Sequence, residues 1–77
     1  MNMTAAQTQK LTHIKTLYGD QLESFAITKN GLLFVRIKYK YSKILAYMES
    51  YFGPNGEWVE INYYRKDDNS SHYKNSK

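Results

Sequence analysis

The chain has 77 residues, a net charge of +4 and no cysteine. A chain of this length forms one domain with a thin core, because only about 60% of the unfolded surface is buried at this size. The lack of cysteine excludes disulfides, thiolate metal sites and cysteine nucleophiles. The apolar runs are far shorter than the roughly 20 residues that span a bilayer, and the first residues lack the pattern of a signal peptide. We therefore expect a soluble, cytoplasmic protein with no membrane partner.

The first predicted element is a helix from Thr4 to Tyr18. Thr4 is followed three residues later by Gln7, which matches a capping box. An apolar stripe with spacings of three and four follows, and Gly19 is a natural end for the helix. The stripe consists of Leu11, Ile14, Leu17 and Tyr18. We expect this stripe to pack on a sheet while the opposite, polar face meets solvent.

Two β-rich runs follow within residues 21–41 and are joined at Asn30-Gly31. This dipeptide is typical of a two-residue type I′ turn, in which both residues need positive φ. That loop places Phe25 opposite Arg36, a pairing that permits a cation–π contact. The residues predicted to face the helix are Leu22, Ser24, Ala26, Thr28, Leu33, Val35, Ile37 and Tyr39. The residues predicted to face outward are Phe25, Phe34, Arg36, Lys38 and Lys40.

A second hairpin is predicted within residues 44–65, with a loop at residues 53–56. Pro54 lacks an amide hydrogen, and the two flanking glycines permit a chain reversal. A four-residue loop pairs Phe52 with Glu57, whereas a three-residue loop would pair Phe52 with Trp58. In the four-residue register the core face holds Ile44, Ala46, Met48, Phe52, Val59, Ile61 and Tyr63. The outward face holds Leu45, Tyr47, Glu49, Tyr51, Trp58, Glu60, Asn62 and Tyr64, with Glu49 opposite Glu60.

The predicted fold class is α+β, with one N-terminal helix packed on a four-stranded antiparallel β-meander. Residues 1–65 form a single small domain in this prediction. Residues 66–77 are too polar to pack, and we expect them to be a disordered C-terminal tail. The helix covers one face of the sheet, which leaves the other face partly open.

Motifs of catalysis and cofactor binding are missing. The chain has no Gly-rich phosphate loop, dinucleotide fingerprint, nucleophile elbow or HExxH zinc helix. His13 is predicted on the solvent face of the helix and His72 in the tail, so neither is a good metal ligand. Asp67-Asp68 lacks the further oxygen ligands that a hard cation needs. We therefore predict a non-enzymatic protein with no metal and no cofactor.

The predicted open sheet face carries the clearest functional signal. Aromatic rings interleaved with Lys and Arg suit single-stranded nucleic acid, because bases stack on the rings while the cations neutralise phosphates. The predicted binding residues are Phe34, Arg36, Lys38, Lys40, Tyr47, Tyr51, Trp58 and Tyr64. A nucleic-acid-binding module is therefore the leading hypothesis.

Other interpretations of the same residues stay open. Tyr, Trp and Arg are also the usual anchors of protein interfaces, so the face could serve a protein-binding inhibitor or adaptor, or a homodimer. The aromatic residues could instead be core, covered by the tail or by a second copy, and the row of Lys38, Lys40 and Lys43 could protect an edge strand. The enzyme hypothesis is a metal-independent ribonuclease, for which Arg36, Tyr64, Arg65 and Lys66 supply the residue types without a recognisable motif. The small, basic make-up suits many short bacterial or phage proteins.

Overall fold

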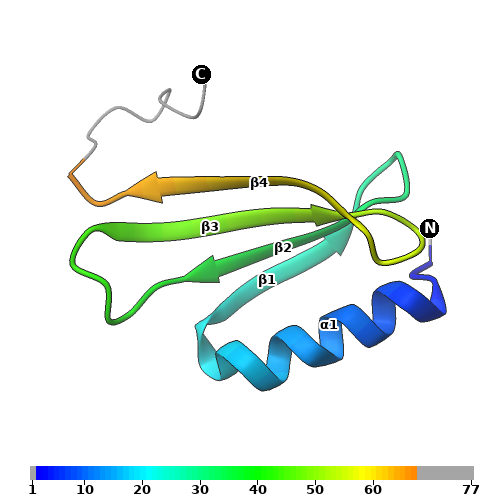
Figure 1. The fold of residues 1–77 in the computed structure, drawn as a ribbon, viewed down its shortest axis with the longest axis horizontal. Coiled ribbons are helices and arrows are strands. Elements are labelled where there is room, and N and C mark those ends of the chain that lie inside the picture. Colours follow the sequence, from blue (N-terminus) through cyan, green and yellow to red (C-terminus); the bar gives the residue numbers. More distant parts are fainter. Residues whose placement is uncertain (1, 68–77) are drawn as a thin grey trace.

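The computed structural model describes residues 2–67 and shows one helix beside a four-stranded antiparallel sheet in the order β1-β2-β3-β4 (Figure 1). The elements are α1 (Ala5–Tyr18), a short 3-10 helix (Gly19–Gln21), β1 (Leu22–Ile27), β2 (Leu33–Lys38), β3 (Leu45–Phe52) and β4 (Trp58–Arg65). The predicted α+β class and the helix-plus-meander order are confirmed. The predicted tail lies outside the described residues from position 68 onward.

The ends of α1 follow the sequence prediction. The N–H of Gln7 donates to Thr4 Oγ1 at 3.1 Å, and the N–H of Thr4 donates to Gln7 Oε1 at 3.0 Å, so the capping box is confirmed. At the other end Gly19 adopts a φ of 56°, and its N–H donates to the Lys15 carbonyl oxygen. The positive φ explains why glycine ends the helix, since other residues reach this region only with strain.

The helix covers only part of the sheet. Figure 1 shows α1 along the β1 side, and among the strands its backbone lies closest to β1 and β2. Leu11 and Ile14 are buried as predicted, but Leu17 is 62% exposed. The prediction for Leu17 was wrong because the apolar stripe is wider than the strip of sheet beneath the helix.

The loop of the first hairpin has three residues, Lys29 to Gly31, so the predicted two-residue type I′ turn is wrong. The N–H of Gly31 donates to the Thr28 carbonyl oxygen at 3.0 Å, and the N–H of Thr28 donates to the Leu32 carbonyl oxygen at 2.8 Å. Gly31 has a φ of 81°, whereas no other type of residue within 2–67 has a positive φ. This is a tight turn closed by a left-handed glycine, a second loop type that suits Asn-Gly.

The three-residue loop shifts β1 by one position against β2, which reverses the faces of β1. Phe25 pairs with Val35 and lies on the α1 side, where Lys15 Nζ is 5.3 Å from its ring centroid. The predicted contact of Phe25 with Arg36 is therefore wrong. Ser24 pairs with Arg36 and Ala26 with Phe34, so both lie on the opposite face from the one predicted. A bulge between Leu22 and Ser24 returns Leu22 to the α1 side, where it packs against the core.

The second hairpin closes in the same way, over Pro54 to Gly56. The N–H of Gly56 donates to the Gly53 carbonyl oxygen at 2.9 Å, and Gly56 has a φ of 79°. Phe52 pairs with Trp58, which was the three-residue alternative, so the predicted pairing with Glu57 is wrong.

A bulge follows at the start of β4 and changes the pairing further along the hairpin. Tyr51 pairs with Glu60, and Glu49 pairs with Asn62. The predicted opposition of Glu49 and Glu60 is therefore wrong.

The core lies between α1 and the middle of the sheet. The three alternate residues of β2, Leu33, Val35 and Ile37, have no exposed surface, which confirms the predicted inward set for this strand. The other buried apolar residues are Leu11, Ile14, Met48 and Phe52. Ile44 and Val59 were predicted in the core but are exposed, because they lie beyond the two ends of the regular β3–β4 ladder.

Candidate functional site

The open sheet face is the side of the sheet that α1 does not cover. The strand register arranges it in three rows across β2, β3 and β4. The rows are Lys38–Tyr47–Tyr64, Arg36–Glu49–Asn62 and Phe34–Tyr51–Glu60. On β1, Ser24 and Ala26 extend the second and third rows.

Six of the eight predicted binding residues share this face. They are Phe34, Arg36, Lys38, Tyr47, Tyr51 and Tyr64. Lys40 lies beyond the end of β2, where its Nζ is 2.7 Å from Asp20 Oδ2. Trp58 lies on the α1 side, because it pairs with the buried Phe52. The prediction of Trp58 on the open face was wrong, because the predicted register paired Phe52 with Glu57, one residue away from its observed partner.

Arg36 is at the centre of the open face and is matched by two carboxylates. Its Nε lies 3.2 Å from Glu23 Oε1 and 3.6 Å from Glu49 Oε2, and the atom is buried without a hydrogen bond. The guanidinium carbon is 4.0 Å from the ring centroid of Tyr47, a cation–π contact. The two carboxylates and the ring hold this cation in place and leave little of its charge for a phosphate.

The tyrosines beside Arg36 are neutral hydrogen-bonding groups. Burial raises the pKa of Tyr64, and the negative charge of Glu49 adds to the rise. Tyr64 donates its hydroxyl hydrogen to Glu49 Oε1 at 3.1 Å. Burial also raises the pKa of Tyr51, whose ring centroid is 5.3 Å from that of Phe34. The centre of the face is thus aromatic, hydrogen-bonded and net negative, since two carboxylates surround one arginine.

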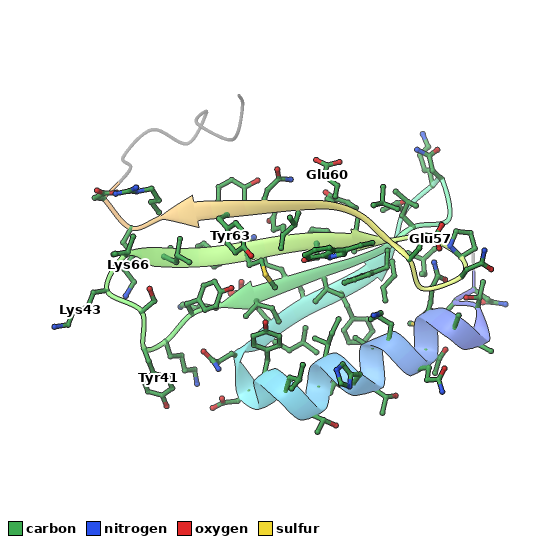
Figure 2. The ribbon with its side chains drawn as sticks, viewed as in Figure 1. Tyr41, Lys43, Glu57, Glu60, Tyr63 and Lys66 are labelled. Atoms are coloured by element: carbon green, nitrogen blue, oxygen red, sulfur yellow. The ribbon has the colours of Figure 1, made fainter. Side chains whose placement is uncertain are left out.

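Lysines gather at one end of the sheet, around the β2–β3 loop. Lys66 donates from its N–H to the Ile44 carbonyl oxygen at 2.8 Å and from Nζ to the Ser42 carbonyl oxygen at 2.6 Å. These bonds place Lys66 beside Lys43, and Figure 2 shows both side chains at this end. Tyr41, in the same loop, is 85% exposed. We call Lys38, Lys40, Lys43 and Lys66, together with Tyr41, the lysine-rich end.

Two ion pairs lower the net charge here. The hydrogen bond with Lys40 holds the pKa of Asp20 below its usual value, and Asp20 in turn raises the pKa of Lys40. Arg65 likewise holds the pKa of Asp67 below its usual value. Within residues 2–67, no carboxylate lies within ion-pair distance of Lys38, Lys43 or Lys66.

Sequence reasoning did not place Tyr41, Lys43 and Lys66 in the site. Lys43 and Lys66 are far apart in the chain, and only the pairing of β3 with β4 brings them together. A usable signal is the tyrosine-lysine alternation of residues 38–43, which predicts either binding residues at Lys38 and Lys40 or protection of an edge strand.

An apolar groove of about 300 Å³ lies on the other side of the sheet, between α1 and the β3–β4 hairpin. Its lining includes Ile14, Leu17, Met48, Phe52, Trp58 and Tyr63. Trp58 is 64% exposed, and Tyr63 is also exposed. The helix lies nearer to β1 and β2 than to β4, and on β4 Ile61 is partly buried against the core while Tyr63 is exposed.

The other candidate chemistries have little geometric basis. In the part of the chain that the structure describes, no three side chains of His, Cys, Asp or Glu come together to hold a metal ion. Of the residues considered for a ribonuclease, Arg36 and Tyr64 both contact Glu49, whereas Arg65 binds Asp67. No helix within residues 2–67 is long and apolar enough to cross a membrane.

No protein-family model, curated protein or solved structure matches the chain.

Proposed function

We propose that the protein is a non-enzymatic binding module that holds a single-stranded nucleic acid at its lysine-rich end. The observation that supports this proposal is the convergence of Lys38, Lys43 and Lys66 from three segments of the chain. None of the three has a carboxylate partner within residues 2–67, so their charges are available to phosphates.

The exposed ring of Tyr41 supplies the stacking surface. A base that stacks on an aromatic side chain gains about 1–3 kcal/mol, and every base has a face that can stack. Tyr47 and Tyr64 continue from Lys38 onto the open sheet face, in the same row. The site therefore offers stacking and charge without base-specific hydrogen bonds, which favours weak sequence preference.

The centre of the open face is a poor place for phosphates. Arg36 is neutralised by Glu23 and Glu49, and Glu60 adds a further negative charge in the third row. In this proposal Arg36 positions the ring of Tyr47 and does not contact the nucleic acid. We therefore expect the phosphates of the nucleic acid to bind at the lysine-rich end.

Fluorescence anisotropy with labelled single-stranded oligonucleotides at several salt concentrations tests the proposal. The informative variant is Lys38→Gln/Lys43→Gln/Lys66→Gln, and the matched control is Lys10→Gln/Lys15→Gln/Lys29→Gln, which removes the same charge elsewhere. Each phosphate contact contributes about 0.7 to the slope of log affinity against log salt on a single strand. We expect the first variant to lower the slope by about 2, and the control to change it much less.

Absence of binding by the wild type at low salt would overturn the proposal. Equal losses in the two variants would also overturn it, because only the total charge would then matter. Gel analysis of RNA recovered from the same titrations tests the ribonuclease hypothesis, which intact RNA excludes.

A second candidate function is protein docking on the open face, as an inhibitor or adaptor. The cluster of Arg36 with Glu23 and Glu49, beside several tyrosines, supports it, because Arg and Tyr are enriched among the anchors of protein interfaces. A pull-down with wild type and with Tyr51→Arg, which places a cation at the middle of the face, tests it. A partner that both proteins retain equally does not use this face.

A further inference from the structure

The outer edge of β4 is open to pairing. The sheet ends at β4 on one side and at β1 on the other. Within residues 2–67, β4 pairs only with β3, so the N–H and C=O groups along its other side have no strand partner. Such an edge is a ready template for another strand.

The two edges of the sheet differ in their protection. β1 is shorter, is interrupted by a bulge and has α1 along its side (Figure 1). β4 has eight residues and contains no proline, glycine or lysine. Its bulge lies at its start, near Val59, and the ladder from Glu60 to Tyr64 is regular. β4 therefore lacks most of the devices that proteins use to block edge pairing.

Charge along β4 is divided between its two ends. Glu60 lies near the start of the strand, whereas Arg65 ends it and Lys66 follows. Arg65 holds Asp67 of its own chain, which leaves Lys66 as the basic group without a carboxylate partner among the described residues. Antiparallel pairing with an identical strand brings the acidic start of each copy beside the basic end of the other, whereas parallel pairing opposes like charges.

From these features we propose that two copies of this chain pair through their β4 strands, antiparallel, about a two-fold axis close to Asn62. Residues directly opposite in an antiparallel ladder share a face of the sheet. This register places Ile61 opposite Tyr63 of the second copy on the α1 side. On the open face it places Glu60 opposite Tyr64 and diagonal to Lys66, within reach of a long side chain. Lys66 Nζ exchanges its bond to the Ser42 carbonyl oxygen for this contact.

The dimer is one continuous sheet with both helices on the same side. The two apolar grooves meet at the axis, so the exposed rings of Trp58 and Tyr63 gain cover from the second copy. Stable complexes usually bury about 800 Å² of accessible surface on each partner. Pairing through one strand per copy buries less surface than this. We therefore expect dissociation constants in the micromolar range.

Analytical ultracentrifugation without nucleic acid, from micromolar to millimolar protein, tests the pairing. The expected mass rises from 9.1 kDa toward twice that value as the concentration increases. Glu60→Lys and Lys66→Glu should each weaken the dimer about tenfold, since each creates two like-charge contacts. The double variant Glu60→Lys/Lys66→Glu restores both contacts with reversed charge and should dimerise like the wild type. Lys29→Glu, in the first hairpin loop, is the matched control for Lys66→Glu and should have no effect.

Two further measurements test the pairing through β4. An equimolar mixture of the two single variants should form a mixed dimer, because one native and one reversed contact remain. Emission of Trp58, the single tryptophan, should shift to longer wavelength when the wild type is diluted. A mass of 9.1 kDa at every concentration, or a dimer that Glu60→Lys leaves unchanged, would overturn pairing through β4. Neither result bears on nucleic-acid binding at the lysine-rich end.

Discussion

Gln7, in the first turn of α1, donates a hydrogen bond from Nε2 to the carbonyl oxygen of Gly31 at 2.9 Å. The same nitrogen donates to the Phe52 carbonyl oxygen at 3.3 Å, and Gln7 is only 1% exposed. Thr4 Oγ1 adds a bond to the Pro54 carbonyl oxygen at 2.6 Å. The start of the helix is thereby joined to the closed ends of both hairpins.

Replacement of Gln7 by alanine should destabilise the fold. The change removes the capping bond to Thr4 and leaves two carbonyl oxygens without their side-chain donor, a loss of about 1–3 kcal/mol in the free energy of unfolding. Urea denaturation monitored by circular dichroism measures it. Gln9→Ala, on the exposed side of the same helix, is the control and should change stability by about 0.5 kcal/mol or less.

Gln7→Glu separates the two roles of the side chain. A glutamate keeps the acceptor for the Thr4 N–H but loses the donor and brings a carboxylate toward two carbonyl oxygens. Burial among these oxygens should raise the pKa of the new carboxyl above its unfolded value of about 4.3. A raised pKa means that the folded state binds the proton more tightly, so stability relative to wild type should fall as pH rises above about 4. A constant difference across this range would contradict the assigned hydrogen bonds.

Asn30 and Gly31 should respond differently to alanine. Gly31 has a φ of 81°, so Gly31→Ala should cost about 1–2 kcal/mol of stability. Asn30 has no positive φ, so Asn30→Ala should cost about 0.5 kcal/mol or less. A type I′ turn would require positive φ at both positions, and a large loss at Asn30 would therefore indicate that turn. Thermal or urea unfolding of the two variants decides between the loops.

Ile14 and Leu17 test how far α1 covers the sheet. Ile14 is buried, and Ile14→Ala should cost about 2–5 kcal/mol. Leu17→Ala should cost roughly 1 kcal/mol or less, because full burial of a leucine contributes about 1.5–3 kcal/mol and most of this side chain is exposed. Both variants introduce alanine, a strong helix former, so helix propensity is not reduced at either position. The difference between the two losses of stability therefore measures packing against the sheet. Equal losses in chemical denaturation would show that the helix covers more of the sheet.

Alkaline pH should destabilise the protein through two partly buried phenols, those of Tyr51 and Tyr64. Burial raises the pKa of Tyr51 and Tyr64 above the ordinary value of 10.0, so the folded state holds these protons more tightly than the unfolded state. Stability from this source is present below pH 10 and is lost as pH rises through the folded pKa. The urea concentration at the unfolding midpoint should fall between about pH 9 and about pH 11. This fall should be smaller for Tyr51→Phe/Tyr64→Phe than for wild type, because the variant lacks the two phenols. Tyr41→Phe, whose ring is in solvent, is the control and should behave like wild type.

Local sequence determined the elements of this protein. The capping box and Gly19 define α1, and the breaker residues at Asn30-Gly31 and Pro54 to Gly56 separate the strands. The alternation of apolar residues in β2 predicted its buried face correctly. These features depend on the conformational preferences of single residues and their near neighbours, which do not need the rest of the fold.

Tertiary structure decided the register and therefore the content of each face. Asn-Gly is compatible with two-residue and three-residue loops, and a shift of one residue moves every side chain of a strand to the other face. The observed register packs Leu22 and Ile27, both partly buried, against the core and lets Gln7 reach both hairpins. It also places Trp58 on the α1 side, not on the open face as predicted, and it places Lys66 beside the β2–β3 loop. The sequence alone could not choose, because these gains come from contacts between residues far apart in the chain.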